Sequence, residues 1–231
     1  MSYVVVVGDR AYSSWSLRGW LMLERFGLTA EVVIAPMYTP GFASTLDAFP
    51  PARLVPALRI EGEGGPLVVW DTLAIAETLA ERHPDLGLWP SEARLRALAR
   101  SLAAEMHAGF TALRGDCPMN LRRCYEGFKP SAAVRADLAR IEALWSLARA
   151  TSGAPGPWLF GSYCLADVFF APVAARIATY DLPVGEPAAA YVAAHLADPA
   201  FRAWRAAGLA DPVVHPHYDQ DLPEQPWPGP S

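Results

Sequence analysis

Cysteine is scarce in this sequence: three occur among 231 residues, at Cys117, Cys124 and Cys164. No two of them are separated by only two residues, so the chain lacks the CxxC motif of thioredoxin-type disulfide oxidoreductases. An odd and widely spaced set also excludes the paired framework that staples small secreted domains. A reducing compartment is the simplest setting for this composition, and we expect a cytoplasmic location.

Long apolar runs and an excess of basic charge are absent as well. The chain has 19 Lys and Arg residues against 24 Asp and Glu residues, a formal net charge of −5, which gives no electrostatic reason to expect nucleic acid or an anionic membrane as partner. No apolar stretch approaches the roughly 20 residues needed to span a bilayer. The first one, Val4–Val7, ends at once in Gly8 and Asp9, so no secretory signal is predicted.

Histidine matches no metal-binding motif. The histidines are His83, His107, His195, His215 and His217, and none belongs to an HExxH or comparable arrangement. We therefore predict no metal site. His215 and His217 lie in a proline-rich segment and are expected to be solvated rather than to act as ligands.

Strand and helix signals alternate in the first third of the chain. Hydrophobic residues make up 52% of the sequence and charged residues 19%, enough for one large domain or two small ones. The predicted strands are 3–7, 31–35, 57–60 and 66–70, and the predicted helices are 15–26 and 73–83, with at most one short helix in the loop 36–51. A strand–helix–strand start implies a parallel pair with a right-handed crossover. The closing hairpin adds antiparallel strands, so the order predicts a small thioredoxin-like α/β layer.

Strand signals disappear after a proline-flanked segment, 84–90. The predicted helices of the second part are 91–113, 131–150, 165–180, 188–197 and 199–206. The third of these is apolar around most of its circumference and is expected at the centre of a bundle. The predicted organisation is an α/β domain at 1–83, a linker at 84–90, an all-helical C-terminal domain at 91–211 and a proline-rich tail at 212–231, draped on the surface or disordered.

Two dipeptides of the first domain suggest a dock for a peptide-like ligand. Pro56 stands at the mouth of the hairpin, a fixed corner at which the X-Pro bond can adopt either the cis or the trans form. An extended Val55 leaves its backbone N–H and C=O free to pair with a peptide. Asp71 and Thr72 begin the next helix, whose free N–H groups attract a carboxylate. The alternative is an ordinary turn proline followed by an ordinary N-cap.

A serine-rich loop, Tyr12-Ser13-Ser14-Trp15-Ser16-Leu17-Arg18, joins the first strand to the first helix. Ligands of α/β sheets collect at the C-terminal ends of strands, and hydroxyls beside a helix start can donate to an anion such as a thiolate. N-capping explains one of the three serines equally well. No His or carboxylate accompanies the serines, so a Ser/His/Asp hydrolase is poorly supported.

Taken in order, these motifs resemble the cytosolic glutathione S-transferases, particularly bacterial members near the serine-type theta and zeta classes. The resemblance covers about residues 3–207 and includes Trp158-Leu159-Phe160-Gly161 and Cys164-Leu165-Ala166-Asp167 in the helical part. It implies a thioredoxin-like glutathione-binding domain followed by an all-α bundle. It also implies that Ser14 donates a hydrogen bond to the glutathione sulfur, with Ser13 as the competing serine and Tyr12 as the fallback donor.

The resemblance further assigns glutathione contacts. Val55 would pair its backbone with the cysteinyl part, beside a cis Pro56, and Asp71 and Thr72 would hold the γ-glutamyl amino and carboxylate groups. Leu54 belongs to the same stretch but stands where relatives have Lys or Gln, so one contact to the glycyl carboxylate is expected to be missing.

In the helical part, the resemblance makes Asp167 the acid of a capping box. Cys164 stands where relatives have Ser or Thr, so we expect that helix to start less firmly or to use Ser162 as its cap.

The implied activity is that of a glutathione transferase: the thiolate, activated without a general base, attacks an apolar electrophile, as in detoxification. The second substrate is expected between the halves, lined by Tyr12, Trp15, Met106, His107, Phe110 and Arg114, of which Met106 and Phe110 fit a core role equally well. Glutathione is the implied co-substrate, no metal is implied, and a homodimer is expected.

Alternatives to a glutathione transferase are a glutathione-dependent isomerase or dehalogenase, or a non-catalytic binding protein. The zeta pattern has an aromatic residue just before its Arg, whereas Leu17 precedes Arg18, so maleylacetoacetate isomerase is not assigned.

Overall fold

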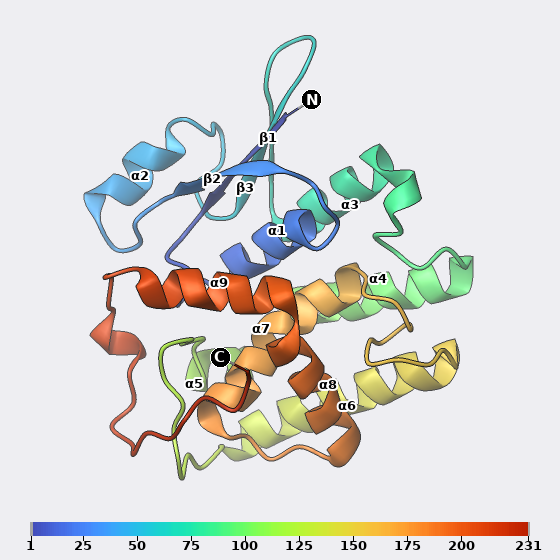
Figure 1. Ribbon diagram of the computed structural model, residues 1–231, viewed down its shortest axis with the longest axis vertical. Coiled ribbons are helices and arrows are strands. Elements are labelled where there is room, and N and C mark those ends of the chain that lie inside the picture. Colours follow the sequence, from blue (N-terminus) through green and yellow to red (C-terminus); the bar gives the residue numbers. More distant parts are fainter. Residues whose placement is uncertain (1, 231) are drawn as a thin grey trace. The chain divides into compact units, whose positions relative to one another are not determined.

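Residues 2–230 are described by a computed structural model of the chain, and they fall into two units, one ending at Leu88 and the other beginning at Trp89 (Figure 1). The first unit is a thioredoxin-like mixed sheet with helices, and the second is helical. The predicted fold class is therefore confirmed. No helix within 2–230 is long and apolar enough to cross a membrane.

The sheet of the first unit has four strands in the order β2-β1-β3-β4. The strands are β1 (Ser2–Val7), β2 (Ala30–Ile34), β3 (Ala57–Glu61) and β4 (Leu67–Trp70). β1 pairs parallel with β2 and antiparallel with β3, and β3 pairs antiparallel with β4. Residues 3–7 are buried, as the continuous apolar run predicts for a central strand.

The helices of this unit are α1 (Ser14–Glu24), the short α2 (Pro40–Leu46) and α3 (Thr72–Arg82), followed by the 3-10 turn η1 (Pro84–Leu86). α1 packs against β1 and α3. Val4 and Val6 point to a cluster with Leu46 and Phe49, so the loop that carries α2 covers one face of β1. Successive residues of a strand face opposite sides, which leaves the other face to α1 and α3.

The helical unit is built around α7 (Leu165–Tyr180), all sixteen residues of which are buried. The surrounding helices are α4 (Ala93–Ala108), α5 (Thr111–Asp116), α6 (Ala132–Ser152), α8 (Glu186–Ala197) and α9 (Pro199–Ala210). α4 and α8 pack directly on α7. The predicted central position of this apolar helix is confirmed, because a helix that is hydrophobic all round has to be enclosed.

The prediction of one helix over 91–113 is wrong, because the chain breaks between α4 and α5. Gly109 is extended and Phe110 has a φ of 57°. A Cβ at position 109 would lie 2.8 Å from the carbonyl oxygen of Glu105, so this conformation requires glycine. Asp137 of α6 accepts a hydrogen bond from Leu113 N at 2.9 Å. The start of α5 is thus stabilised by a hydrogen bond to Asp137 of α6.

The start of α7 is fixed by Asp167, which is completely buried. Its carboxylate accepts hydrogen bonds from Leu159 N at 3.1 Å, Cys164 N at 2.9 Å and the Tyr191 hydroxyl at 2.8 Å. Burial raises the pKa of Asp167, and these bonds act in the opposite direction. The capping-box role of Asp167 is confirmed. Cys164 is the N-cap, so the expectation that Ser162 replaces it is wrong: the acid holds the backbone of the turn, and the cap needs no hydroxyl.

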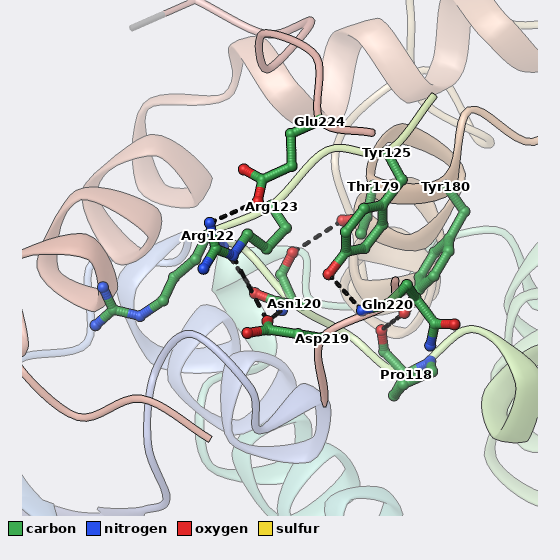
Figure 2. Close-up of polar contacts among 10 residues, drawn as sticks. All are labelled: Pro118, Asn120, Arg122, Arg123, Tyr125, Thr179, Tyr180, Asp219, Gln220 and Glu224. Carbon is green, nitrogen blue, oxygen red and sulfur yellow. Dashed lines mark hydrogen bonds and ion pairs between the residues drawn. The ribbon is translucent and has the colours of Figure 1, made fainter. Parts of the chain in front are cut away.

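The proline-rich tail lies on the helical unit and includes a 3-10 turn, η2 (Pro216–Tyr218). Figure 2 shows its attachment to the segment after α5: Asn120 Nδ2 donates to Asp219 at 2.9 Å, and Gln220 N donates to the Tyr125 hydroxyl at 3.0 Å. Arg123 and Glu224 form an ion pair at 2.7 Å. Of the two predicted alternatives for the tail, the surface-draped one is observed.

The expectation of two solvated tail histidines is only half right. His217 is exposed, whereas His215 is buried. The two rings lie 5.6 Å apart, and the His215 ring is also 6.1 Å from that of Tyr218. His215 precedes the turn η2, whose residues His217 and Tyr218 pack their rings near it, and the local sequence does not signal these contacts.

Asp167→Ala should lower the free energy of unfolding by about 3–5 kcal/mol, because two backbone N–H groups and a hydroxyl lose a buried acceptor together. Ser131→Ala is the matched control: Ser131 caps α6 by accepting from Val134 N at 3.2 Å, and loss of such a cap costs about 1 kcal/mol. Urea unfolding of both variants measures the difference. Equal losses in the two variants would show that Asp167 is an ordinary cap.

Candidate functional site

The register of the sheet brings three loop segments to one end of it. Val6 of β1 is paired with Ala57 of β3, and Ala57 is paired with Trp70 of β4. The end of β1, the start of β3 and the end of β4 therefore lie side by side. The serine loop follows the first of these points, Val55 and Pro56 precede the second, and Asp71 follows the third.

The peptide bond between Val55 and Pro56 is cis, as predicted. Pro56 is buried, Val55 is half-buried against the core of the first unit, and Leu54 is 74% exposed. α1 approaches the proline ring very closely at Gly19, where a Cβ would lie 2.6 Å from both Cβ and Cγ of Pro56. A residue without a side chain is required there. This contact fixes α1 against the Val55–Pro56 corner.

The serines of the loop divide into two groups. Ser13 is the N-cap of α1: its Oγ accepts from Ser16 N at 3.3 Å and donates to Ser16 Oγ at 2.7 Å. Ser16 Oγ also accepts from Gly8 N at 2.8 Å, and both hydroxyls are buried. Ser14 is the first residue of α1 and is only half-buried. The capping role therefore falls on Ser13.

Two neighbours of Ser14 differ in accessibility. Tyr12 is buried and Trp15 is half-buried. The guanidinium of Arg18 lies 4.4 Å from the centre of the Trp15 ring, and Arg18 is only 1% exposed. Ser16 and Arg18 are structural members of the loop that the sequence interpretation did not single out. A buried arginine one turn after a cap gives no local signal, since its spacing is that of any helix surface.

Asp71 adopts an unusual backbone conformation, with φ at 71° and ψ at 132°. Its Oδ1 accepts a hydrogen bond from Leu73 N at 2.8 Å, so it caps α3. Thr72, the first residue of α3, is 2% exposed. For a non-glycine residue, this backbone conformation costs about 1–3 kcal/mol, and such residues cluster at functional sites. The sequence identified the Asp71–Thr72 pair but not this strain.

The four residues predicted from the helical part lie around the break between α4 and α5. Met106 is completely buried on the same face of α4 as Leu102, so it is a core residue. Phe110 is also buried, and His107 packs its ring against Phe169 with centroids 6.4 Å apart. Arg114 donates to the carbonyl oxygens of His107 and Gly109. Their contact with a second substrate stays a prediction.

The protein's own thiols are poor nucleophiles. Burial raises the pKa of Cys117 to about 12 and also raises that of Cys124 and Cys164. The thiolate is the reactive form of cysteine, and a raised pKa lowers the fraction of each of these groups that is thiolate. Among residues 2–230 no cluster of three or more His, Cys, Asp or Glu side chains could hold a metal ion. Sulfur chemistry at this site would need a thiol brought by a ligand.

Residues 12–82 match the family model described as the glutathione S-transferase N-terminal domain. A maleylacetoacetate isomerase of Rattus norvegicus is 27% identical over 176 residues, covering 72% of this chain and 74% of that protein. A probable maleylacetoacetate isomerase of Caenorhabditis elegans is 31% identical over 104 residues, covering 45% of this chain and 46% of that protein. The latter match spans less than half of the nematode protein.

Solved structures share the fold over nearly the whole chain. A glutathione transferase homolog from Burkholderia with bound glutathione has a TM-score of 0.66 at 22% identity, covering 91% of this chain and 100% of that chain. Maleylacetoacetate isomerase from Anaeromyxobacter dehalogenans with bound glutathione has a TM-score of 0.62 at 24% identity, covering 96% and 98%. The combination of the two units is thus that of the glutathione transferases.

Proposed function

We propose that this protein binds glutathione at the end of the sheet where Val55, the start of α1 and the start of α3 converge, and activates its thiol for attack on an apolar electrophile. The observation that carries the proposal is the strand register Val6–Ala57–Trp70. It supports the proposal because the cis-proline corner, the strained N-cap Asp71 and the serine at the start of α1 adjoin strand ends that lie side by side.

The dimensions of the ligand agree with those of the site. Neighbouring strands are about 4.8 Å apart, so β1, β3 and β4 span about 10 Å. An extended tripeptide has about the same length. In the proposed pose the γ-glutamyl amino and carboxylate groups meet Asp71 and Thr72 at the start of α3, the cysteinyl backbone pairs with Val55, and the sulfur reaches α1. The related structures named above contain glutathione, which supports the choice of ligand.

Thiol activation needs little energy. A free thiol has a pKa of about 8.5, so only a few per cent is ionised at neutral pH. A hydrogen bond from a hydroxyl to a charged acceptor contributes about 1.5–3 kcal/mol, and each pKa unit corresponds to about 1.4 kcal/mol. One hydroxyl, with the positive end of α1, thus lowers the thiol pKa to near neutrality. No general base is required.

Ser14 is the preferred donor to the sulfur. The hydroxyl hydrogen of Ser13 is directed at Ser16, 2.7 Å away, and its lone pairs cap α1. Ser14 is the first residue of α1 rather than its N-cap, and it is half-buried. Tyr12, which is buried, is the fallback donor. The contact of Trp15 with the electrophile, the homodimer and the cytoplasmic location stay predictions.

Glutathione-dependent cis–trans isomerisation is the second candidate. Both curated relatives are maleylacetoacetate isomerases by name, whereas sequence reasoning left that activity unassigned. The same thiolate would add to a conjugated double bond, allow rotation about the resulting single bond and then leave, so that glutathione is regenerated.

Incubation with 1-chloro-2,4-dinitrobenzene and with a cis-enedione acid separates the candidates: conjugation consumes one glutathione per product, and isomerisation consumes none. Binding of glutathione without turnover of either substrate would indicate a non-catalytic protein.

Ser14→Ala should lower kcat/KM for the preferred electrophile about 10- to 100-fold at pH 7 and move the rising limb of the pH profile up by about one to two units. The sign follows from the thiol: without the donor its pKa returns towards that of free glutathione, so a higher pH is needed for the same thiolate fraction. Ser13→Ala is the control, with an expected stability loss of about 1 kcal/mol and an unchanged pH profile. Equal profiles in the two variants would remove the role of Ser14.

Thr72→Ala should weaken glutathione binding about 10-fold, because the γ-glutamyl carboxylate loses one hydroxyl donor at the start of α3. Calorimetry with glutathione measures this directly, without any electrophile. Thr45→Ala is the matched control, since Thr45 Oγ1 donates to Gly41 O at 2.7 Å within α2. An affinity in Thr72→Ala equal to that of Thr45→Ala would contradict the proposed pose.

A further inference from the structure

The helical unit contains a cavity of about 810 Å³ that lies entirely among its own residues. One wall is the C-terminal turn of α7 with the following loop, represented by Ile177 and Leu182, and a second wall is the face of α8 that carries Val192 and Leu196. Cavities of about 300–1,000 Å³ with mainly apolar linings are typical of sites for small molecules. The size and lining of this cavity are those of a ligand site.

The third wall is the end of the tail, residues 225–230. Specific contacts hold this wall: Gln225 N donates to Cys124 O at 2.8 Å, and the Arg205 guanidinium lies 4.3 Å from the centre of the Trp227 ring. At Gly229 a Cβ would lie 2.9 Å from Leu196 Cβ, so the tail approaches α8 as closely as a glycine allows. The third wall of the cavity is thus held in place by specific contacts with the rest of the helical unit.

The charge of the lining is one-sided. Asp181, the C-cap of α7, is the single residue with a full charge among those that line the cavity within the described chain. No cationic side chain within 2–230 forms an ion pair with it. Burial is the main cause that raises the pKa of Cys124, which lines the same cavity; the charge of Asp181 adds to this effect, and Arg205, which is outside the lining, opposes it. The C-terminus of α7 adds the partial negative charge of its last carbonyl groups. The cavity therefore favours a positive charge over a negative one.

We propose that this cavity is a second binding site, separate from the glutathione site, for an apolar molecule that carries a protonated amine. The apolar body packs against α7, α8 and the prolines of the tail, and the ammonium group lies at Asp181. The site shares no residue with the proposed glutathione site of the first unit, and none with the helix residues that were predicted to line the second-substrate site.

The test uses the full-length protein and two naphthyl probes that differ in charge, 1-naphthylmethylamine and 1-naphthylacetate, measured by calorimetry at pH 7 and low salt. We expect the amine to bind about three- to tenfold more tightly than the carboxylate, as one partly solvated charge allows. Asp181→Asn keeps a residue that tolerates the left-handed conformation and should remove the preference. Equal affinities for the two probes in the unaltered protein would overturn the role of Asp181.

A pair of substitutions on α8 tests the location. Ala193 and Ala190 are both exposed alanines, but only Ala193 lines the cavity. Ala193→Trp fills the cavity and should lower the affinity of the amine at least 10-fold, whereas Ala190→Trp and Ser14→Ala should leave it unchanged. Circular dichroism confirms that the variants are folded. Equal affinities in Ala193→Trp and Ala190→Trp would place any binding elsewhere and overturn the proposal.

Discussion

The pairing of β3 with both β1 and β4 is the constraint on which the rest of the first unit depends. It sets Val6, Ala57 and Trp70 in one row, and the three segments of the candidate site adjoin the ends of those strands. Side chains alternate across a strand, so a slip of one residue would exchange Val4 and Val6, which face the Leu46–Phe49 cluster, with the residues that face α1 and α3. The register thus determines which loop segments lie side by side at the candidate site.

Local conformations that are costly on their own gather around this row. Asp71 is strained, Gly19 is pressed against the ring of Pro56, and the hydroxyls of Ser13 and Ser16 are buried. Each is tolerated because its surroundings hold it: Asp71 binds Leu73 N, and Ser16 receives hydrogen bonds from Gly8 and Ser13. Such over-determined strain is typical of binding sites. It leaves Ser14 as the accessible hydroxyl among the loop's serines, which agrees with its proposed role as donor to a thiolate.

The helical unit is organised by a different device, a buried carboxylate. Asp167 accepts three hydrogen bonds and joins the loop at Leu159, the start of α7 and Tyr191 of α8. A buried carboxylate whose hydrogen bonds are all formed fixes the directions of its donors, whereas hydrophobic contacts have no preferred direction. The tail then closes the other end of α7 through its contacts with the 120–125 segment (Figure 2). The end of the tail also forms one wall of the apolar cavity and approaches Leu196 of α8 closely at Gly229.

The sequence by itself determined the strands, most of the helices, the cis-proline corner and the order of the motifs. These depend on neighbours in the chain: periodicity, proline geometry and caps act within a few residues. Only the tertiary structure decided the break at Phe110, the choice of Cys164 as cap, the burial of His215 and the capping role of Ser13. Asp137 from α6 bonds Leu113, and Asp167 holds Leu159 and Cys164. These outcomes depend on which groups meet after packing, and a buried polar group takes the partner that packing supplies.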